Sequence, residues 1–150
     1  MQIQVGKPAP KIKTSEFSLA GLKGQRVVLF FFPKADTPGC TAESCEFRDA
    51  HETFLKKNAV IVGISPDKTA AHAKFAAKYS LPFTLVADPE HTIAEAYGVW
   101  KEKSMYGRNY MGIDRSTFLI DRTGIIRRIW RKVKVTGHVA EVLAAAKALN

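Results

Sequence analysis

Cys40 and Cys45, the only two cysteines of the 150-residue chain, lie five positions apart. They follow the most apolar run of the sequence, residues 27–32, which predicts a strand buried on both faces. A turn containing proline and glycine comes next, and the segment from Thr41 to about Lys57 is expected to be a helix. The nucleophilic form of cysteine is the thiolate, which the free N–H groups and dipole of a helix N-terminus favour. A helix opened by Thr37-Pro38 holds Cys40 in its first turn, so the stretch indicates thiol chemistry.

The five-residue spacing has a geometric consequence. It is not the C-x-x-C spacing of a thioredoxin-type dithiol or a zinc knuckle, so both are disfavoured. In an ideal helix, residues five apart are rotated by about 140° and separated by about 7.5 Å along the axis, which gives roughly 8.6 Å between the two Cα atoms. A disulfide needs less than about 7 Å. We therefore expect separated thiols in the reduced state and local unwinding of the first turns in a disulfide state. The alternative is two unrelated cysteines in one helix.

Thr37 and Pro33, which precede Cys40, each have a structural and a chemical interpretation. Thr37-Pro38 fits a helix N-cap followed by proline at the first helical position. The Thr37 hydroxyl can cap the helix or point at the thiolate and its reaction partner, and the sequence leaves both roles open. Pro33 can end the strand, or it can shield the thiolate from water and remove one backbone donor.

The local charge balance does not favour a thiolate. Glu43 and Glu46 lie close to Cys40 and oppose a second negative charge. Lys34 is the only basic residue close by in the sequence. We therefore expect a cation from elsewhere in the fold.

The surrounding elements alternate between strands and helices before a final hairpin and helix. We expect strands at 26–32, 59–64, 83–87, 115–120 and 125–133, and helices at 41–57, 69–79, 91–97 and 136–149. Residues 99–114, which are irregular and rich in aromatic side chains, are expected to form a long loop.

The whole-chain composition is that of an ordinary globular protein. Residues 1–150 are expected to form one domain with a sizeable hydrophobic core. No apolar run is long enough to span a membrane, and the first six residues lack the features of a signal peptide. We therefore expect a cytoplasmic protein, in which a disulfide is catalytic rather than structural. The net charge of +9 has its densest run at 127–134, which we interpret as a solvated edge strand and not as a nucleic-acid site.

Two features of the sequence resemble known proteins. The order β-α-β-α-β followed by β-β-α resembles the thioredoxin fold, a central mixed sheet flanked by helices, and peroxiredoxins add an N-terminal extension and an inserted helix to it. Pro33-x-x-x-Thr37-x-x-Cys40 resembles the peroxiredoxin signature. Residues 36–41, with Cys45 five residues after Cys40, resemble the PrxQ group, also called bacterioferritin comigratory proteins. The similarity continues through residues 97–100 and 112–121.

This resemblance implies a thiol peroxidase that reduces hydrogen peroxide and organic hydroperoxides. By resemblance, Cys40 becomes a sulfenic acid, Thr37 and Pro33 shape the pocket, and Arg115 supplies the missing cation. Cys45 is the implied resolving cysteine that forms a disulfide with Cys40. Thioredoxin is the implied reductant, with glutaredoxin as an alternative. By resemblance, the protein needs no metal or organic cofactor and is a monomer. From the charge pattern and the absence of a long apolar run, we expect it to bind neither nucleic acid nor membrane.

The same pair of cysteines permits a second function. A redox-sensing adaptor could use the same disulfide to change a binding surface, and it need not turn over repeatedly.

The remaining polar and aromatic residues give weaker signals of function. The four histidines are expected at the surface, and Cys40, Cys45 and His51 do not make a convincing zinc set. Some side chains of the 99–114 loop could line a peroxide pocket or pack beneath the loop, and packing is favoured: Trp100, Met105, Tyr106 and Tyr110.

Overall fold

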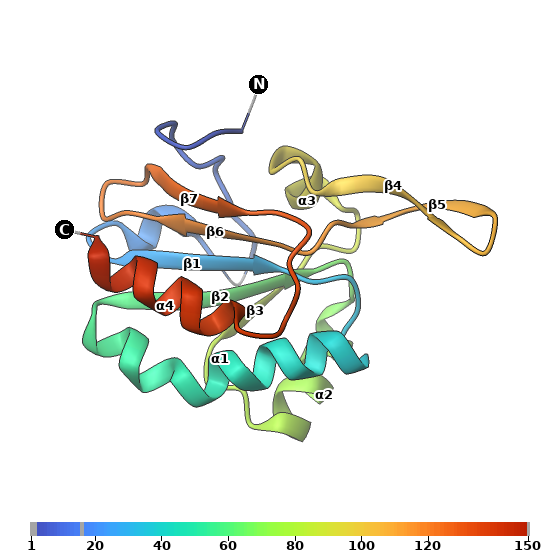
Figure 1. Ribbon diagram of the computed structural model, residues 1–150, viewed down its shortest axis with the longest axis horizontal. Coiled ribbons are helices and arrows are strands. Elements are labelled where there is room, and N and C mark those ends of the chain that lie inside the picture. The colour runs from blue at the N-terminus through green and yellow to red at the C-terminus, as the bar shows by residue number, and fades with distance from the viewer. Residues whose placement is uncertain (1–2, 16, 150) are drawn as a thin grey trace.

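The computed structural model describes residues 3–15 and 17–149 and contains a five-stranded mixed sheet flanked by helices (Figure 1). The strand order is β3-β2-β1-β6-β7, with β1–β2 and β2–β3 parallel and β1–β6 and β6–β7 antiparallel. The strands of this sheet are β1 (Arg26–Phe31), β2 (Ala59–Ser65), β3 (Thr84–Ala87), β6 (Ser116–Ile120) and β7 (Ile126–Trp130). The helices are η1 (Leu19–Leu22), α1 (Pro38–Lys56), α2 (Thr69–Tyr79), α3 (Thr92–Ala96) and α4 (His138–Ala148). The expectation of no signal peptide rests partly on residues 1 and 2, which lie outside the described residues.

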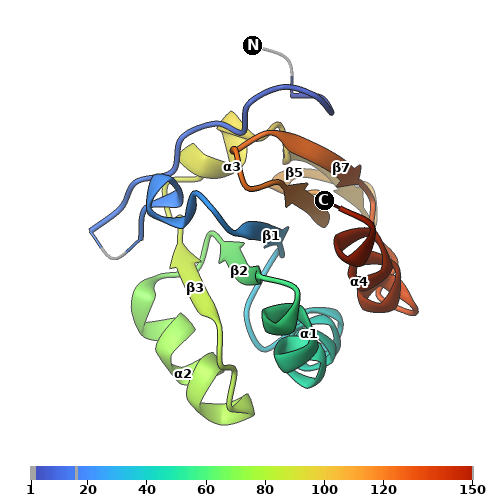
Figure 2. The same cartoon turned by 90° about the vertical axis from the view of Figure 1, so that its left-hand side faces the viewer.

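The central strand β1 is buried on both faces, as its continuous apolar run predicts. Val28 and Phe30 point into a core shared with α1, α2 and α4. Leu29 and Phe31 point into a second core, closed by the N-terminal segment and the region around α3. Figure 2 shows these two layers on opposite sides of the sheet. The strand is therefore held in place from both sides.

The sheet topology decides which distant segments meet at the end of β1. Because β6 runs antiparallel to β1, Phe31 near the end of β1 pairs with Ser116 at the start of β6. The chain leaves β1 through residues 32–37 and enters α1 at Pro38, with Thr37 as the N-cap. Residues immediately before Ser116 consequently lie beside the first turn of α1.

Residues 99–114 do not form the predicted loop. They form a two-stranded antiparallel hairpin, β4 (Trp100–Met105) and β5 (Arg108–Ile113), which projects from the body of the molecule (Figure 1). Tyr106 and Gly107 make the tight turn, with φ values of 53° and 77°. A two-residue turn of this kind is ordinarily signalled by Asn-Gly or Asp-Gly, and most side chains of both strands are exposed. Without a turn signal or a buried face, the sequence pattern lacks the alternation that identifies a strand.

The basic run at 127–134 begins within β7, which is an edge strand of the five-stranded sheet, as its charge predicts. Among the described residues, no helix has the length and hydropathy needed to cross a membrane.

Candidate active site

Cys40 and Cys45 both lie within α1 as free thiols. Cys40 is the third residue of the helix and is fully buried, whereas Cys45 is half-buried. Cys40 packs into the core that contains Phe47 and Phe54. The structure therefore shows the reduced protein with both cysteines in the helix. From this arrangement, a Cys40–Cys45 disulfide can form only after the first turns of α1 unwind.

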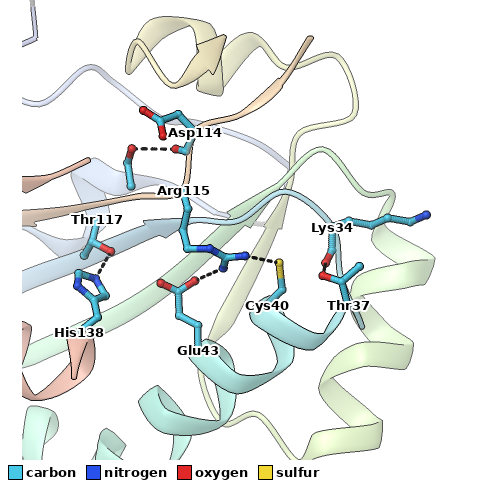
Figure 3. Close-up of polar contacts among 9 residues, drawn as sticks. Lys34, Thr37, Cys40, Glu43, Asp114, Arg115, Thr117 and His138 are labelled. Carbon is cyan, nitrogen blue, oxygen red and sulfur yellow. Dashed lines mark hydrogen bonds and ion pairs between the residues drawn. The ribbon is translucent and has the colours of Figure 1, made fainter. Parts of the chain in front are cut away.

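The guanidinium of Arg115 lies directly against the Cys40 sulfur (Figure 3). Its Nη2 donates a hydrogen bond to Cys40 Sγ at 3.2 Å, and its Nη1 donates to Glu43 Oε1 at 2.7 Å. The Arg115 side chain is only 16% exposed. A cation from a segment 75 residues away thus reaches the thiol, because the antiparallel pairing of β1 and β6 brings the two segments together. A fixed positive charge beside sulfur favours the thiolate.

Glu43, which the sequence places among the charges that oppose a thiolate, is the ion-pair partner of Arg115, and its side chain is fully buried. Burial, only partly offset by Arg115, raises the pKa of Glu43 to about 7. Burial acts to lower the pKa of Arg115, but Glu43 and Cys40 outweigh it and raise that pKa. The i,i+3 spacing from Cys40 places Glu43 on the same helix face and was the available signal.

Thr37 and Pro33 lie in the loop that leads into the helix. The Thr37 hydroxyl donates to the carbonyl of Lys34 at 2.8 Å and caps no helical N–H (Figure 3). Its hydrogen is thereby committed, while its oxygen remains able to accept a hydrogen bond. Pro33 is half-buried and directly follows the buried Phe32.

The loop before Cys40 is tied to α2 and to the turn before it. Asp36 has a left-handed backbone with φ of 61°, which aspartate tolerates better than most residues. Its carboxylate accepts hydrogen bonds from Lys78 Nζ at 2.9 Å and from the Tyr79 hydroxyl at 2.8 Å. These two contacts, Lys78 first, lower the pKa of Asp36. The Ala35 N–H donates to Asp67 Oδ2 at 2.8 Å, so the loop is anchored at two points.

Gly39 leaves room for the arginine. A Cβ at this position would lie 3.2 Å from Arg115 Nη2. That separation is closer than ordinary van der Waals contact, so a Cβ here would require the guanidinium to shift by a few tenths of an ångström. The Gly39-Cys40 pair in the motif therefore has a packing reason that only the tertiary structure reveals.

The expectation that the histidines lie at the surface is wrong for two of the four. His72 and His138 are buried, whereas His51 and His91 are half-buried. His138, at the start of α4, is 2.8 Å from Thr117 Oγ1 through its Nε2 (Figure 3). Burial lowers the pKa of His138 to about 4, with a further lowering from Arg115. This imidazole is therefore neutral near pH 7 and adds no charge beside the arginine. Within the described part of the chain, no group of three or more His, Cys, Asp or Glu side chains could hold a metal ion.

The packing interpretation of the 99–114 side chains is also wrong for three of the four residues. Met105, Tyr106 and Tyr110 are exposed on the hairpin. Trp100 is half-buried and stacks on His91 with ring centroids 4.1 Å apart.

The buried carboxyl of Glu43 gives a testable pH dependence of stability. Because the folded-state pKa of Glu43 is raised to about 7 from 4.5, the folded protein binds more protons than the unfolded chain between these values. The stability of the wild type relative to Glu43→Gln is therefore expected to be greatest below pH 4.5 and to fall by up to about 3 kcal/mol as the pH rises through 7. Denaturant unfolding at several pH values measures this difference.

Glu46→Gln is the matched control, since Glu46 is an exposed carboxyl on the same helix. Its stability difference from the wild type is expected to change little over the same pH range. A flat profile for Glu43→Gln would contradict the raised pKa.

The sequence and the fold are similar to those of known proteins. The family model described as AhpC/TSA family matches residues 5–129. "Peroxiredoxin Bcp" of Bacillus subtilis is 49% identical over 155 residues, covering 100% of this chain and 99% of its own. A solved mutant of Xylella fastidiosa PrxQ is 37% identical with a TM-score of 0.90, covering 99% of this chain and 98% of its own. Xanthomonas campestris bacterioferritin comigratory protein, whose structures address its alkyl peroxide reduction activity, is 43% identical with a TM-score of 0.84, covering 88% of this chain and 84% of its own.

Proposed function

The chain belongs to the AhpC/TSA family as a peroxiredoxin of the PrxQ/Bcp group, a thiol peroxidase with a thioredoxin-like fold, and we propose from this premise a cycle carried by Cys40 and Cys45. The observation that supports Cys40 as the peroxidatic residue is the 3.2 Å hydrogen bond from Arg115 to its sulfur. Cys40 is the buried thiol of the pair and lies in the first turn of α1, where the helix N-terminus also favours an anion.

The first step transfers one oxygen from the peroxide to sulfur. The Cys40 thiolate attacks one oxygen of the hydroperoxide, the S–O bond forms and the O–O bond breaks. The leaving alkoxide or hydroxide takes up a proton, which gives an alcohol or water and leaves Cys40 as a sulfenic acid. Arg115 and the Cys40 N–H stabilise the charge as it moves from sulfur to the leaving oxygen. The Thr37 oxygen, whose own hydrogen is held by Lys34, accepts a hydrogen bond from the peroxide, and Pro33 limits access of water.

The second step forms the disulfide. The Cys45 thiolate attacks the Cys40 sulfur, the S–O bond breaks and hydroxide leaves, becoming water on protonation. Because both residues are helical in the reduced protein, this step needs the first turns of α1 to unwind. An external protein dithiol, thioredoxin or glutaredoxin, then reduces the disulfide by thiol–disulfide exchange.

Hydrogen peroxide and organic hydroperoxides are the proposed substrates, and the alkyl peroxide activity of the Xanthomonas campestris relative supports the organic class. We place the enzyme in the cytoplasm as a monomer with residues 1–150 forming one domain. Sedimentation of the reduced and oxidised protein tests the monomer, which a concentration-dependent dimer would contradict.

Substitution of the proposed resolving cysteine separates the two chemical steps. Cys45→Ser is expected to undergo one oxidation of Cys40 at a rate within about threefold of the wild type, because Cys45 takes no part in the attack on peroxide. It is expected to lose steady-state turnover with thioredoxin and to form no intramolecular disulfide. Stopped-flow oxidation and mass analysis of the product measure both. Full turnover with thioredoxin by this variant would overturn the resolving role.

A further inference from the structure

The projecting β4–β5 hairpin carries exposed apolar side chains at its tip and on one face, which we call the hairpin patch: Met105, Tyr106 and Tyr110. Their exposed fractions are 55%, 98% and 43%, whereas Met111, which is 48% exposed, pairs with Glu102 on the opposite face. The other large apolar residues exposed to this degree in the described part of the chain, Val5 and Leu55, are isolated from the hairpin in sequence. Tyrosine and methionine are enriched at protein interfaces. The apolar surface of the molecule is thus concentrated on one protruding element.

The fold itself does not account for this patch. The Tyr106 side chain, with 98% exposure, contributes nothing to the packing of the core. β4 and β5 pair only with each other and form a separate two-stranded sheet. A two-stranded hairpin without further packing is marginally stable in water. Exposed apolar side chains on such an element indicate an interaction surface.

The base of the hairpin is continuous with the thiol site. β5 ends at Ile113, two residues before Arg115, and the Asp114 N–H donates to the carbonyl of Val99 at 2.8 Å. The half-buried Lys103 runs beside Gly112, whose Cβ would lie 3.5 Å from Lys103 Cδ. Figure 1 shows the hairpin leaving the same end of the sheet at which α1 begins. A partner seated on the hairpin therefore stands at the end of the molecule that holds Cys40.

The charge of the β4–β5 hairpin indicates what kind of protein would bind to it. Three basic residues and one acidic residue lie on the two strands: Lys101, Glu102, Lys103 and Arg108. The whole chain carries a net charge of +9, so a second copy would be repelled and an acidic protein attracted. A cationic rim around Tyr and Met side chains fits a protein that has an apolar contact area bordered by acidic groups.

We propose that the hairpin patch docks the protein dithiol that reduces the oxidised enzyme. This inference rests on the proposed function, since it needs a disulfide at Cys40 and Cys45. Six-residue strands extend about 20 Å, and a globular protein of about 100 residues has a radius of gyration of about 13 Å. Such a protein is wider than the hairpin is long, so it can contact the patch and reach the first turns of α1 at the same time.

The test compares a protein reductant with a small one. Tyr106→Asn combined with Met105→Ser removes two of the three side chains of the patch, and asparagine suits the left-handed turn position of Tyr106. With thioredoxin and its reductase, kcat/KM for thioredoxin is expected to fall at least about tenfold. Turnover with dithiothreitol and the rate of Cys40 oxidation by peroxide are expected to stay unchanged. Leu55→Ser, which alters a 47% exposed apolar residue of α1, is the matched control and is expected to change none of these rates.

A charge substitution on the hairpin gives a second test of the docking proposal. Arg108→Glu is expected to lower kcat/KM for thioredoxin about tenfold at low salt and less at high salt, because screening weakens the attraction. Dithiothreitol turnover should not respond.

The outcomes that overturn the docking proposal differ from those that overturn the enzyme cycle. Unchanged kcat/KM for thioredoxin in the hairpin variant, or an equal loss with dithiothreitol, would reject the docking role. Turnover of the wild type with dithiothreitol but with neither thioredoxin nor glutaredoxin would also reject it. A dimer in sedimentation that the hairpin variant abolishes would assign the patch to a second copy. Absence of wild-type turnover with every reductant would instead reject the proposed cycle.

Discussion

Replacement of Cys40 by serine is expected to lower thioredoxin-dependent peroxide consumption by at least about a thousandfold. A serine hydroxyl is not ionised near neutral pH and is a far weaker nucleophile toward a peroxide oxygen than a thiolate. Arg115 and the helix N-terminus remain in place but have no sulfur anion to stabilise. Steady-state peroxide consumption and stopped-flow oxidation measure the loss.

The fold of this variant is expected to persist, because serine is close to cysteine in size and Arg115 can donate to its oxygen as it does to sulfur. Cys45→Ser is the control for the general loss of a thiol, since it keeps the first oxidation. Retention of more than about one-tenth of the wild-type consumption by Cys40→Ser would show that the oxygen transfer occurs elsewhere.

Arg115→Met is expected to slow the oxidation of Cys40 by about a hundredfold to a thousandfold, the usual cost of removing one donor that stabilises developing charge. It removes the hydrogen bond to the Cys40 sulfur and the positive charge that faces it. Arg115→Lys retains the charge but cannot donate from two nitrogens to Cys40 and Glu43 at once, so an intermediate loss is expected. Single-turnover oxidation at fixed pH measures both variants.

The partner carboxylate allows catalysis to be separated from stability. Arg115→Met removes the cation that holds down the pKa of the buried Glu43 carboxyl, so in the variant this group stays protonated to higher pH or ionises without an ion-pair partner. Relative to the wild type, the variant is therefore expected to lose stability as the pH rises above 7. The double variant Arg115→Met/Glu43→Gln is expected to regain stability in denaturant unfolding and to remain slow toward peroxide. If the double variant recovers its rate together with its stability, Arg115 acts only through the fold.

Short stretches of the sequence were enough to predict several elements of the fold. The apolar run 27–32 alone predicts a strand buried on both faces, because hydrophobic side chains at every position need a layer on each side. The proline at position 38 favours the observed start of α1, three residues before the expected Thr41, because its backbone is pre-organised for the first helical position, although the Thr37 hydroxyl caps no helical N–H. The separation of Cys40 and Cys45 follows from helix geometry without any knowledge of the rest of the chain.

The sequence pattern did not predict features that carry no local signal. Residues 99–114 form a hairpin without an Asn-Gly or Asp-Gly turn and without a buried face, so neither signal of a strand pair was present. The histidines show the same limit, because a single His in a helix carries no mark of which face is covered. His138 is buried because α4 packs against the sheet beside Phe47 and Trp130, a fact of assembly.

By itself, the sequence determined that two thiols sit on one helix that follows a buried strand, and that the nearby charges oppose a thiolate. The role of Arg115 as the cation beside Cys40 was predicted only from the family resemblance, because no local sequence pattern indicates it. Only the tertiary structure decided how the site is completed. The antiparallel pairing of β1 with β6 places Arg115 Nη2 3.2 Å from Cys40 Sγ and gives Glu43 an ion-pair partner. The physical reason is that strand pairing brings together segments far apart in the sequence, here those that hold Cys40 and Arg115, 75 residues apart, and helix and strand periodicities do not register such distant pairs.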